Sequence, residues 1–287
     1  MKILVIGAGQ MGAGIAQVAA QSGHDVLLND RGTSFIERGL KVVEKSLDRS
    51  VEKGRLDARA RDEIRARIAA QPDLGPLDVD LAIEAATEHL ETKLELFRRL
   101  DEVCAARAVL ASNTSSISIT LLGGATKRAE RVIGMHFMNP VPVMALVEII
   151  RGIATSQATY EFTRDLAVQM GKTPVEVRDF PGFVSNRVLM PMINEAVYAL
   201  YEGVGTVEAI DTAMKLGANH PMGPLELADF IGLDTALSVM QVLYEGLADS
   251  KYRPCPLLVK YVEAGWLGRK TQRGFYDYRG EKPVPTR

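Results

Sequence analysis

The first half of the chain alternates short apolar runs with longer amphipathic segments. Five runs rich in β-branched and other apolar residues predict strands at residues 2–6, 25–28, 81–84, 108–111 and 131–136. The segments between them place apolar residues at helical spacing, most clearly in residues 88–104. Strands that alternate with helices of this length predict βαβ units and a parallel sheet, which residues 144–150 and 174–177 continue.

The helical segments in this half differ in polarity. Residues 11–22 are rich in alanine and isoleucine and end at Gly23, which is a good helix stop. Residues 34–69 predict two charged helices separated by Gly54, and these helices are too polar to form a core wall. We therefore expect this pair of helices to project outward from the domain.

The second half carries little strand signal beyond residue 185. A broad apolar stripe at helical spacing, uninterrupted by Pro191, predicts a helix that contains Val188, Leu189, Met192, Ile193, Ala196, Val197 and Leu200. Further helices are predicted at residues 207–216, 224–244 and 255–264. We place the domain boundary near residue 183, between a Rossmann-type α/β domain at 1–183 and an all-helical domain at 184–287. The stripe is wider than a small helical core needs, which favours a homodimer through this second domain.

Composition narrows the class of protein. The 287 residues are 47% hydrophobic and 24% charged with a net charge of −2, which is typical of a soluble globular protein with two cores. A near-neutral chain lacks the strongly basic surface of a nucleic-acid-binding protein. The first apolar run is too short for a signal peptide, and no run approaches the ~20 residues that cross a bilayer.

The cysteines point to a reducing compartment. Cys104 and Cys255 lie far apart and form neither a metal-site nor a disulfide spacing pattern. We therefore expect two reduced thiols, no bound metal and a cytoplasmic location.

A glycine-rich turn directly follows the first predicted strand and directly precedes the first predicted helix. The run Gly7-Ala8-Gly9-Gln10-Met11-Gly12 has the spacing G-x-G-x-x-G. The first glycine permits a tight turn, the second lets the backbone approach a pyrophosphate, and the third lets the helix pack on the strand. The free N–H groups of the helix N-terminus attract phosphates. The motif therefore predicts a dinucleotide site; FAD is the chemical alternative, but nothing else in the chain indicates a flavin.

Asp30 lies at the end of the second predicted strand, eighteen residues after Gly12. A carboxylate there can bind the ribose hydroxyls of the adenosine, which favours NAD and repels a 2′-phosphate. The adjacent Arg31 leaves NADP open as a cofactor. The alternative is that Asp30 only forms a turn before Arg31 and Gly32.

Residues 134–150, GMHFMNPVPVMALVEII, contain three polar residues in an otherwise apolar stretch, which are His136, Asn139 and Glu148. A buried polar group without a partner costs about 1–3 kcal/mol, so these side chains are expected to have partners. The turn Asn139-Pro140-Val141-Pro142 lies between two predicted strands and would bring them side by side. The residues alone leave two interpretations open: His136 paired with Glu148, or a core histidine with an unrelated glutamate.

Seven motifs together resemble the short-chain 3-hydroxyacyl-CoA dehydrogenase family, most closely the bacterial 3-hydroxybutyryl-CoA dehydrogenases. They occur in the family's order, and the match they define extends over essentially the whole chain: VIGAGQMGAGIAQ (5–17), IEAATEHLETK (83–93), ASNTSSISIT (111–120), GMHFMNPVPVMALVEII (134–150), PGFVSNR (181–187), NHPMGPLELADFIGLD (219–234) and GRKTQRGFYDY (268–278). The resemblance implies an NAD-dependent oxidoreductase of fatty acid metabolism. Its reaction would interconvert (3S)-3-hydroxyacyl-CoA and 3-oxoacyl-CoA, with short chains favoured.

The resemblance also assigns the chemistry to particular residues. The matching histidine, His136, would be the general base, because imidazole titrates near neutrality. Glu148 would orient the ring and stabilise the imidazolium, so the His136 ring should lie within hydrogen-bonding distance of the Glu148 carboxylate. Ser115 and Asn186 match the pair that contacts the substrate, which places the site in a cleft between the domains. Taken alone, Ser115 and Asn186 could each be a helix N-cap instead.

Further residues match cofactor and CoA contacts of the family. Gly7, Gly9, Gln10, Met11, Gly12 and Asp30 would hold the dinucleotide. The resemblance places additional cofactor contacts at Glu88, Lys93, Ser115, Asn139 and Lys270. It places contacts with the CoA moiety at Ser46, Lys53 and Ser115, where the cation of Lys53 suits the phosphates of CoA.

Two positions depart from the family pattern, and one histidine lies outside it. Met138 replaces a frequent phenylalanine, and Gln272 replaces a usual glycine, which puts the geometry of the loop around Lys270 in question. His220, beside two prolines, is expected at the start of a helix and not in catalysis.

Two other functions are weighed against the leading one. An enzyme with the same fold and cofactor could act on 3-hydroxyadipyl-CoA or on a free hydroxy acid; the presence of Ser46 and Lys53 disfavours the free acid. A non-catalytic dinucleotide-binding or crystallin-like protein would have no need for Ser115, His136, Glu148 and Asn186 together.

Overall fold

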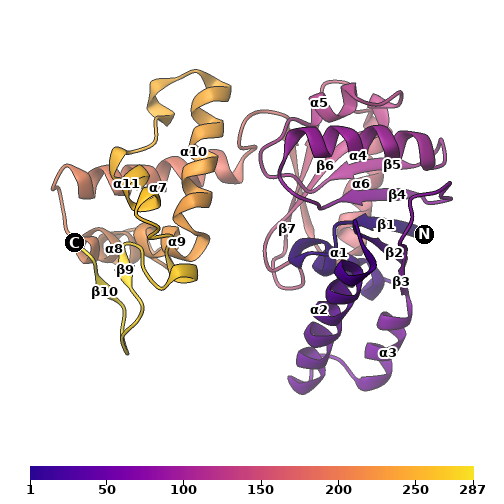
Figure 1. Ribbon diagram of the computed structural model, residues 1–287, viewed down its shortest axis with the longest axis horizontal. Coiled ribbons are helices and arrows are strands. Elements are labelled where there is room, and N and C mark those ends of the chain that lie inside the picture. The colour runs from indigo at the N-terminus through magenta and orange to yellow at the C-terminus, as the bar shows by residue number, and fades with distance from the viewer. The chain divides into compact units, whose positions relative to one another are not determined.

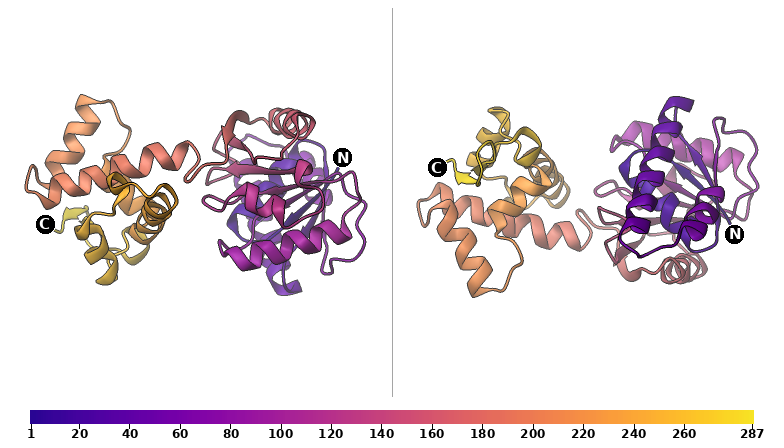
Figure 2. Two further views of the ribbon diagram at one scale, coloured as in Figure 1. Left: turned by 90° about the horizontal axis from the view of Figure 1, so that it is seen from above. Right: turned by 90° about the horizontal axis from the view of Figure 1, so that it is seen from below.

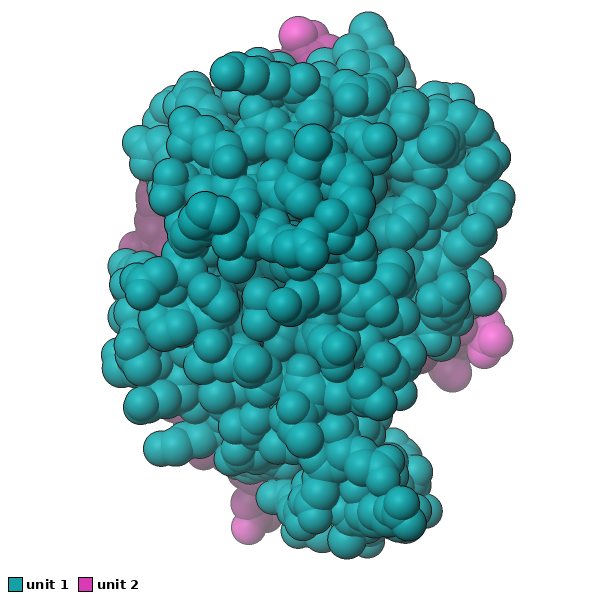
Figure 3. All heavy atoms as spheres, turned by 90° about the vertical axis from the view of Figure 1, so that its right-hand side faces the viewer, with its two compact units in different colours: residues 1–180 teal, residues 181–287 magenta.

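The structure is a computed structural model that describes residues 1–287. The chain divides into two compact units, Met1–Phe180 and Pro181–Arg287, which are coloured separately in Figure 3. By length and apolar composition, none of the helices taken singly could span a membrane; one pair, bent by 98°, passes that test only when its two helices are combined.

The first unit is built on one eight-stranded sheet. Its strands are β1 (Lys2–Ile6), β2 (Asp25–Asn29), β3 (Ile68–Ala70), β4 (Leu81–Glu84), β5 (Val109–Ser112), β6 (Val132–Phe137), β7 (Leu146–Arg151) and β8 (Thr173–Arg178). Their spatial order is β3-β2-β1-β4-β5-β6-β7-β8. All neighbours are parallel except β6 and β7, which form an antiparallel pair. The order in which successive strands are added to the sheet reverses between β1 and β4, where a dinucleotide site is expected in such folds.

Helices cover both faces of this sheet. They are α1 (Gln10–Gln21), α2 (Thr33–Glu52), α3 (Ala58–Ala66), α4 (Leu90–Val103), α5 (Ile119–Gly124) and α6 (Gln157–Gln169). The two opposite views in Figure 2 show the magenta α4 in front of the sheet in one and the indigo α1 and α2 in front in the other. Ile3 and Val5 of β1 share an apolar cluster with Ile15 of α1 and Leu47 of α2. Leu4 is also fully buried and, by strand alternation, faces the opposite side.

The seven strands expected from the sequence in this unit are confirmed to within two residues at each end. The short β3 was not expected, because only one of its three residues is buried. The helix α6 was also not expected: half of its buried residues are Thr159 and Thr163, which obscure the apolar period. The expectation that residues 34–69 form no core wall is wrong for α2, since Val43 and Leu47 belong to the apolar core.

The second unit is helical (Figure 1). Its helices are α7 (Ser185–Tyr201), α8 (Val207–Gly217), α9 (Pro224–Ile231), α10 (Leu233–Leu247) and α11 (Pro256–Glu263). The single helix expected at 224–244 is wrong, because Gly232 has a φ of +104° and turns the chain by 98° between α9 and α10. The expectation of an all-helical unit also needs correction, since β9 (Tyr276–Asp277) and β10 (Val284–Pro285) form a short hairpin.

Candidate active site

The pairing of β6 with β7 brings His136 and Glu148 together. The antiparallel register sets His136 directly opposite Glu148. The ring Nδ1 lies 2.8 Å from Glu148 Oε2, and the two residues are only 6% and 1% exposed. The contact expected from the sequence is therefore present. A carboxylate only accepts hydrogen bonds, so Nδ1 carries the proton and Nε2 is left to accept one.

Ser115 occupies the other side of the imidazole. Its Oγ lies 3.0 Å from His136 Nε2, so the hydroxyl, the ring and the Glu148 carboxylate form one chain of hydrogen bonds. Ser115 follows β5, whose parallel neighbour β6 carries His136, so adjacent strands deliver both side chains to the same edge of the sheet. The alternative role of Ser115 as an N-cap is wrong, because Ser118 caps α5.

Glu88 fixes the backbone around Ser115. Its Oε1 accepts hydrogen bonds from the backbone N–H of Ser115 at 2.9 Å and of Ser116 at 3.0 Å, and from the Thr114 hydroxyl at 2.6 Å. Burial opposes ionisation of Glu88, but the ammonium of Lys93 and these hydrogen bonds outweigh it and hold the pKa of Glu88 below its usual value. The ionised form of Glu88 is thus the form that holds the loop.

Lys93 is buried beside this loop, with 1% of its surface exposed. Its ammonium lies 2.6 and 2.7 Å from the two oxygens of Glu84 and 3.4 Å from Glu88 Oε2. Sequence reasoning selected Lys93 and Glu88 but missed Glu84. A carboxylate at the end of a fully buried strand was the signal that could have identified it, because a charge in that position requires a partner.

The glycine loop has the geometry that a dinucleotide requires. Gly7 has a φ of +95°, a conformation that favours glycine. A Cβ on Gly12 would lie 1.7 Å from the carbonyl oxygen of Gly7, so helix and strand can approach only with glycine there. A Cβ on Gly9, the N-cap of α1, would meet nothing within 4 Å, so the space above the helix N-terminus is open. Phosphates can therefore approach the N–H groups of this helix.

Asp30 lines a cavity beside the glycine loop. Its carboxylate accepts hydrogen bonds from Ala8 N and Arg31 N, each at 2.7 Å. The cavity of about 450 Å³ is lined by Ala8, Gly9, Gln10, Asp30, Phe35, Arg38 and Val42. A carboxylate and a partly apolar wall suit the ribose and adenine of a dinucleotide. The residues present therefore fit NAD.

The turn between β6 and β7 carries Asn139. Its side-chain oxygen accepts a hydrogen bond from Gln10 Nε2 at 3.1 Å, which links the turn to the first residue of α1. The buried ammonium of Lys172 donates to the carbonyl oxygens of Val141 at 2.5 Å and Met144 at 2.9 Å. Sequence reasoning missed Lys172, whose burial depends on where this turn folds.

The candidate CoA contacts lie on α2 and just after it. Ser46 is partly buried, and its carbonyl oxygen accepts a hydrogen bond from the hydroxyl of Ser50. Lys53 is the exposed C-cap residue of the helix.

Other residues singled out from the sequence lie in the second unit. Asn186 is in the first turn of α7 and is not its N-cap, which is Val184. Lys270 is ion-paired with Asp234, its Nζ lying 2.5 and 2.6 Å from the two oxygens. Gln272 adopts a φ of +58°, so the loop keeps the left-handed conformation that a glycine favours. His220 lies in the turn between α8 and α9, three residues before the N-cap Gly223.

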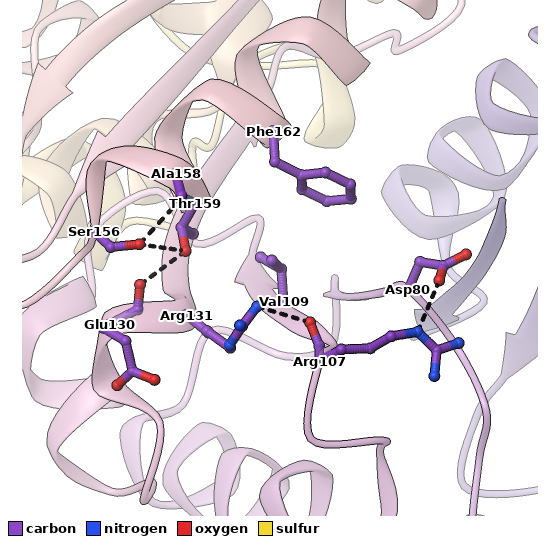
Figure 4. A pocket seen from close by; sticks show the side chains of 9 residues that line it. All are labelled: Asp80, Arg107, Val109, Glu130, Arg131, Ser156, Ala158, Thr159 and Phe162. Atoms are coloured by element: carbon purple, nitrogen blue, oxygen red, sulfur yellow. Dashed lines mark hydrogen bonds and ion pairs between the residues drawn. The ribbon is translucent and has the colours of Figure 1, made fainter.

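A second pocket of the first unit lies at the opposite end of the sheet (Figure 4). It is lined by the residues at the amino ends of β4, β5 and β6 and by the start of α6: Asp80, Arg107, Val109, Glu130, Arg131, Ser156, Ala158, Thr159 and Phe162. Arg107 pairs with Asp80, and the Thr159 hydroxyl donates to the Glu130 carbonyl. None of the residues selected from the sequence lines this pocket, and no group of three or more potential metal ligands occurs in the structure.

Two family models match this chain, and their limits coincide closely with those of the two units. The family model for the 3-hydroxyacyl-CoA dehydrogenase NAD binding domain matches residues 2–180, and the model for the C-terminal domain of the same family matches residues 182–278. A 3-hydroxybutyryl-CoA dehydrogenase of Bradyrhizobium diazoefficiens is 62% identical over 100% of this chain and 98% of its own length. The human mitochondrial hydroxyacyl-coenzyme A dehydrogenase is 44% identical over 96% of this chain and 91% of its own.

Solved structures agree as well. The crystal structure of (S)-3-hydroxybutyryl-CoA dehydrogenase from Ralstonia eutropha matches 97% of this chain and 99% of its own, with a TM-score of 0.95 and 49% identity. Matches of this extent and identity exceed what a shared Rossmann fold alone would give. The chain belongs to the 3-hydroxyacyl-CoA dehydrogenase family and is an NAD-dependent oxidoreductase of that family.

Proposed function

We propose that this protein interconverts (3S)-3-hydroxybutyryl-CoA and acetoacetyl-CoA, with His136 as the general base. The observation that carries the proposal is the chain Ser115–His136–Glu148 at the carboxyl edge of the NAD-binding sheet, with contacts of 3.0 and 2.8 Å. Relatives that are 62% and 59% identical carry the name 3-hydroxybutyryl-CoA dehydrogenase, the second as a probable one, which supports the choice of substrate.

His136 moves the proton in this scheme. In the oxidative direction Nε2 takes the proton of the substrate's 3-hydroxyl, while NAD, when bound, supplies the acceptor for the hydride that leaves C3. The ring becomes an imidazolium whose Nδ1–H points at Glu148, so a buried carboxylate stabilises the charge as it forms. In the reductive direction the same Nε2 returns the proton to the 3-oxo oxygen.

Ser115 and Asn186 position the substrate in this proposal. The Ser115 hydroxyl already lies against Nε2, so an oxygen on C3 can share its hydrogen bond and be aligned with the base. Asn186, from the second unit, would supply an amide to the 3-oxygen or the thioester carbonyl. Lys270, from the same unit, would add a cofactor contact.

The proposed NAD site lies in the first unit, around the glycine loop and Asp30. The glycine loop with Gln10 and Met11 would hold the pyrophosphate, and Asp30 the adenosine ribose. Glu88, Lys93 and Asn139 would border the nicotinamide end. Glu88 contacts Ser115, Asn139 contacts Gln10, and Lys93 contacts Glu88.

The CoA moiety is assigned to α2 through Ser46 and Lys53. Lys45, Arg49 and Lys53 are exposed and follow one another at intervals of four residues, so they form a basic line along one face of the helix. A basic line of this kind suits the phosphates of CoA.

A homodimer formed through the second unit is part of the proposal. That unit leaves large apolar side chains exposed, among them Val188 of α7, which is 68% exposed, and Leu216 of α8, which is 83% exposed. Apolar side chains this exposed on a helical unit favour a contact with a second copy. Sedimentation equilibrium of the purified protein is expected to give twice the chain mass of 31.3 kDa.

A substrate panel tests the function. Purified protein should oxidise NADH with acetoacetyl-CoA. Turnover should be slower with 3-oxoadipyl-CoA or with free acetoacetate, and slower when NADPH replaces NADH. His136→Gln should lose at least about a thousandfold in kcat yet bind NADH as the wild type does. His220→Gln, the matched control, should turn over normally. Wild-type protein that binds NADH but reduces no 3-oxoacyl-CoA would refute the proposal. Faster turnover of 3-oxoadipyl-CoA or of free acetoacetate would show that this compound, and not acetoacetyl-CoA, is the preferred substrate.

A further inference from the structure

Glu84 lies behind the loop that carries Ser115 and is not itself able to bind substrate. It is the last residue of β4 and is 0% exposed. Its oxygens receive hydrogen bonds from Lys93 Nζ at 2.6 and 2.7 Å, from Ser112 Oγ at 2.6 Å and from Ala86 N at 2.7 Å. These four bonds occupy the acceptor sites that a carboxylate offers. Any effect of Glu84 on the reaction must therefore pass through its neighbours.

Two routes lead from Glu84 to the active-site loop. On the first, Ser112 Oγ donates to Glu84 and accepts a hydrogen bond from Thr114 N at 3.2 Å. On the second, Lys93 Nζ contacts Glu84 and lies 3.4 Å from Glu88 Oε2, while Glu88 Oε1 accepts from Ser115 N at 2.9 Å. Both routes end at Ser115 or at the residue before it.

The charge of Glu84 determines which carboxylate pairs with the buried ammonium of Lys93. A buried ammonium must be paired with an anion, and breaking such a pair is costly because a charge is left without compensation. Glu84 is that anion, at less than 3 Å. If Glu84 lost its charge, Glu88 would be the remaining carboxylate next to Lys93. The Glu88 carboxylate already lies 3.4 Å from Lys93 Nζ, so the ammonium would attract it at the expense of its hydrogen bond with the N–H of Ser115.

We propose that Glu84 is a positioning residue for the reaction, which holds Ser115 Oγ against His136 through Lys93, Glu88 and Ser112. The inference rests on the proposed function, in which the contact of 3.0 Å between Ser115 and His136 serves catalysis. A purely structural carboxylate would lower stability without acting through Ser115.

A double-mutant cycle on kcat tests the proposal. Glu84→Gln keeps the shape of the side chain and removes its charge. With Ser115 present it should lower kcat about tenfold, and in the Ser115→Ala background less than about twofold, because the group that it positions is already gone. Equal fold-losses in the two backgrounds would overturn the proposal, as would a Glu84→Gln enzyme with wild-type kcat.

A second variant keeps the test decisive if Glu84→Gln does not fold. Ser112→Ala removes one bond to Glu84 and one to Thr114 without burying a charge, and should lower kcat about threefold with the same dependence on Ser115. Thr163→Val, which removes a buried hydroxyl bonded only within α6, is the matched control and should leave kcat unchanged. Loss of the dependence on Ser115 would overturn the proposal. Wild-type protein without activity on any 3-oxoacyl-CoA would instead refute the function.

Discussion

The two ends of the sheet in the first unit carry charged residues in contrasting arrangements. At the amino end, Arg107 pairs with Asp80, and their side chains are 56% and 31% exposed. At the carboxyl end, Lys93 pairs with Glu84 at 1% and 0% exposure. Exposed pairs contribute little and break easily, whereas buried pairs hold one geometry because separating them is costly.

The difference explains why chemistry is expected at only one end. At the carboxyl end, buried charges fix the partners of His136, so each group meets the ring at a defined distance. At the amino end, the ion pair of Arg107 with Asp80 in the pocket of Figure 4 is partly exposed, so water competes for both groups. The same strands supply both ends; burial determines which charges can position a reacting group.

The largest expected effect at the carboxyl end comes from Glu148. Glu148→Gln should lower kcat by roughly a hundredfold to a thousandfold, because the imidazolium loses its charge partner and the ring loses its fixed tautomer. Steady-state kinetics with acetoacetyl-CoA and NADH measure the loss, and fluorescence titration with NADH should give a Kd close to that of the wild type. A variant that retains kcat would show that the buried pair is only structural.

Removal of the Ser115 hydroxyl should have a smaller effect. Ser115→Ala should lower kcat by roughly tenfold to a hundredfold, because an aligning hydrogen bond is lost while the base remains. Ser118→Ala, at the cap of α5 on the same loop, is the control for a general loosening of the loop. Equal losses in the two variants would assign the effect to loop stability and not to the contact with His136.

The pH dependence of stability tests the role of Glu88. Its pKa is lower in the folded protein than in the unfolded chain, so its stabilisation is present above the unfolded pKa and is lost as the pH falls through the folded one. The difference in Tm between wild type and Glu88→Gln should therefore be greatest near neutral pH and shrink below about pH 4. Thermal melts across that range measure it. A difference that grows in acid would contradict the account.

The smallest expected effect is at the amino end. Arg107→Ala removes the pairs with Asp80 and Asp78, in which Arg107 is 56% exposed, and should leave kcat and KM within about twofold of the wild type. A tenfold loss of activity would show that this end of the sheet is coupled to the reaction and would remove the contrast between the two ends.

Sequence alone predicted the carboxyl-end site unevenly. The polar residues His136 and Glu148 stood out because they interrupt apolar strands, and the family resemblance then implied their contact, which the antiparallel register provides. The bond between Glu84 and Lys93 could not. Whether Lys93 points into the core depends on how α4 packs, and no local pattern encodes that packing.

The fold was also predicted only in part from the sequence. Strands with continuous apolar runs were found, whereas α6 was missed because Thr159 and Thr163 occupy its buried face. The break at Gly232 was missed because the flanking residues keep a helical period through the bend. Local patterns predict which apolar residues are buried, but they do not predict where a helix bends or which polar side chains are buried with a partner.

The most direct test of the central claim is the kcat of the double variant His136→Gln/Glu148→Gln. If Glu148 acts only through the imidazole, its loss costs nothing further once His136 is gone, because groups that act as one unit are not additive. The kcat of the double variant should lie within about twofold of that of His136→Gln alone. A further loss as large as the one Glu148→Gln causes in the wild-type background would contradict it.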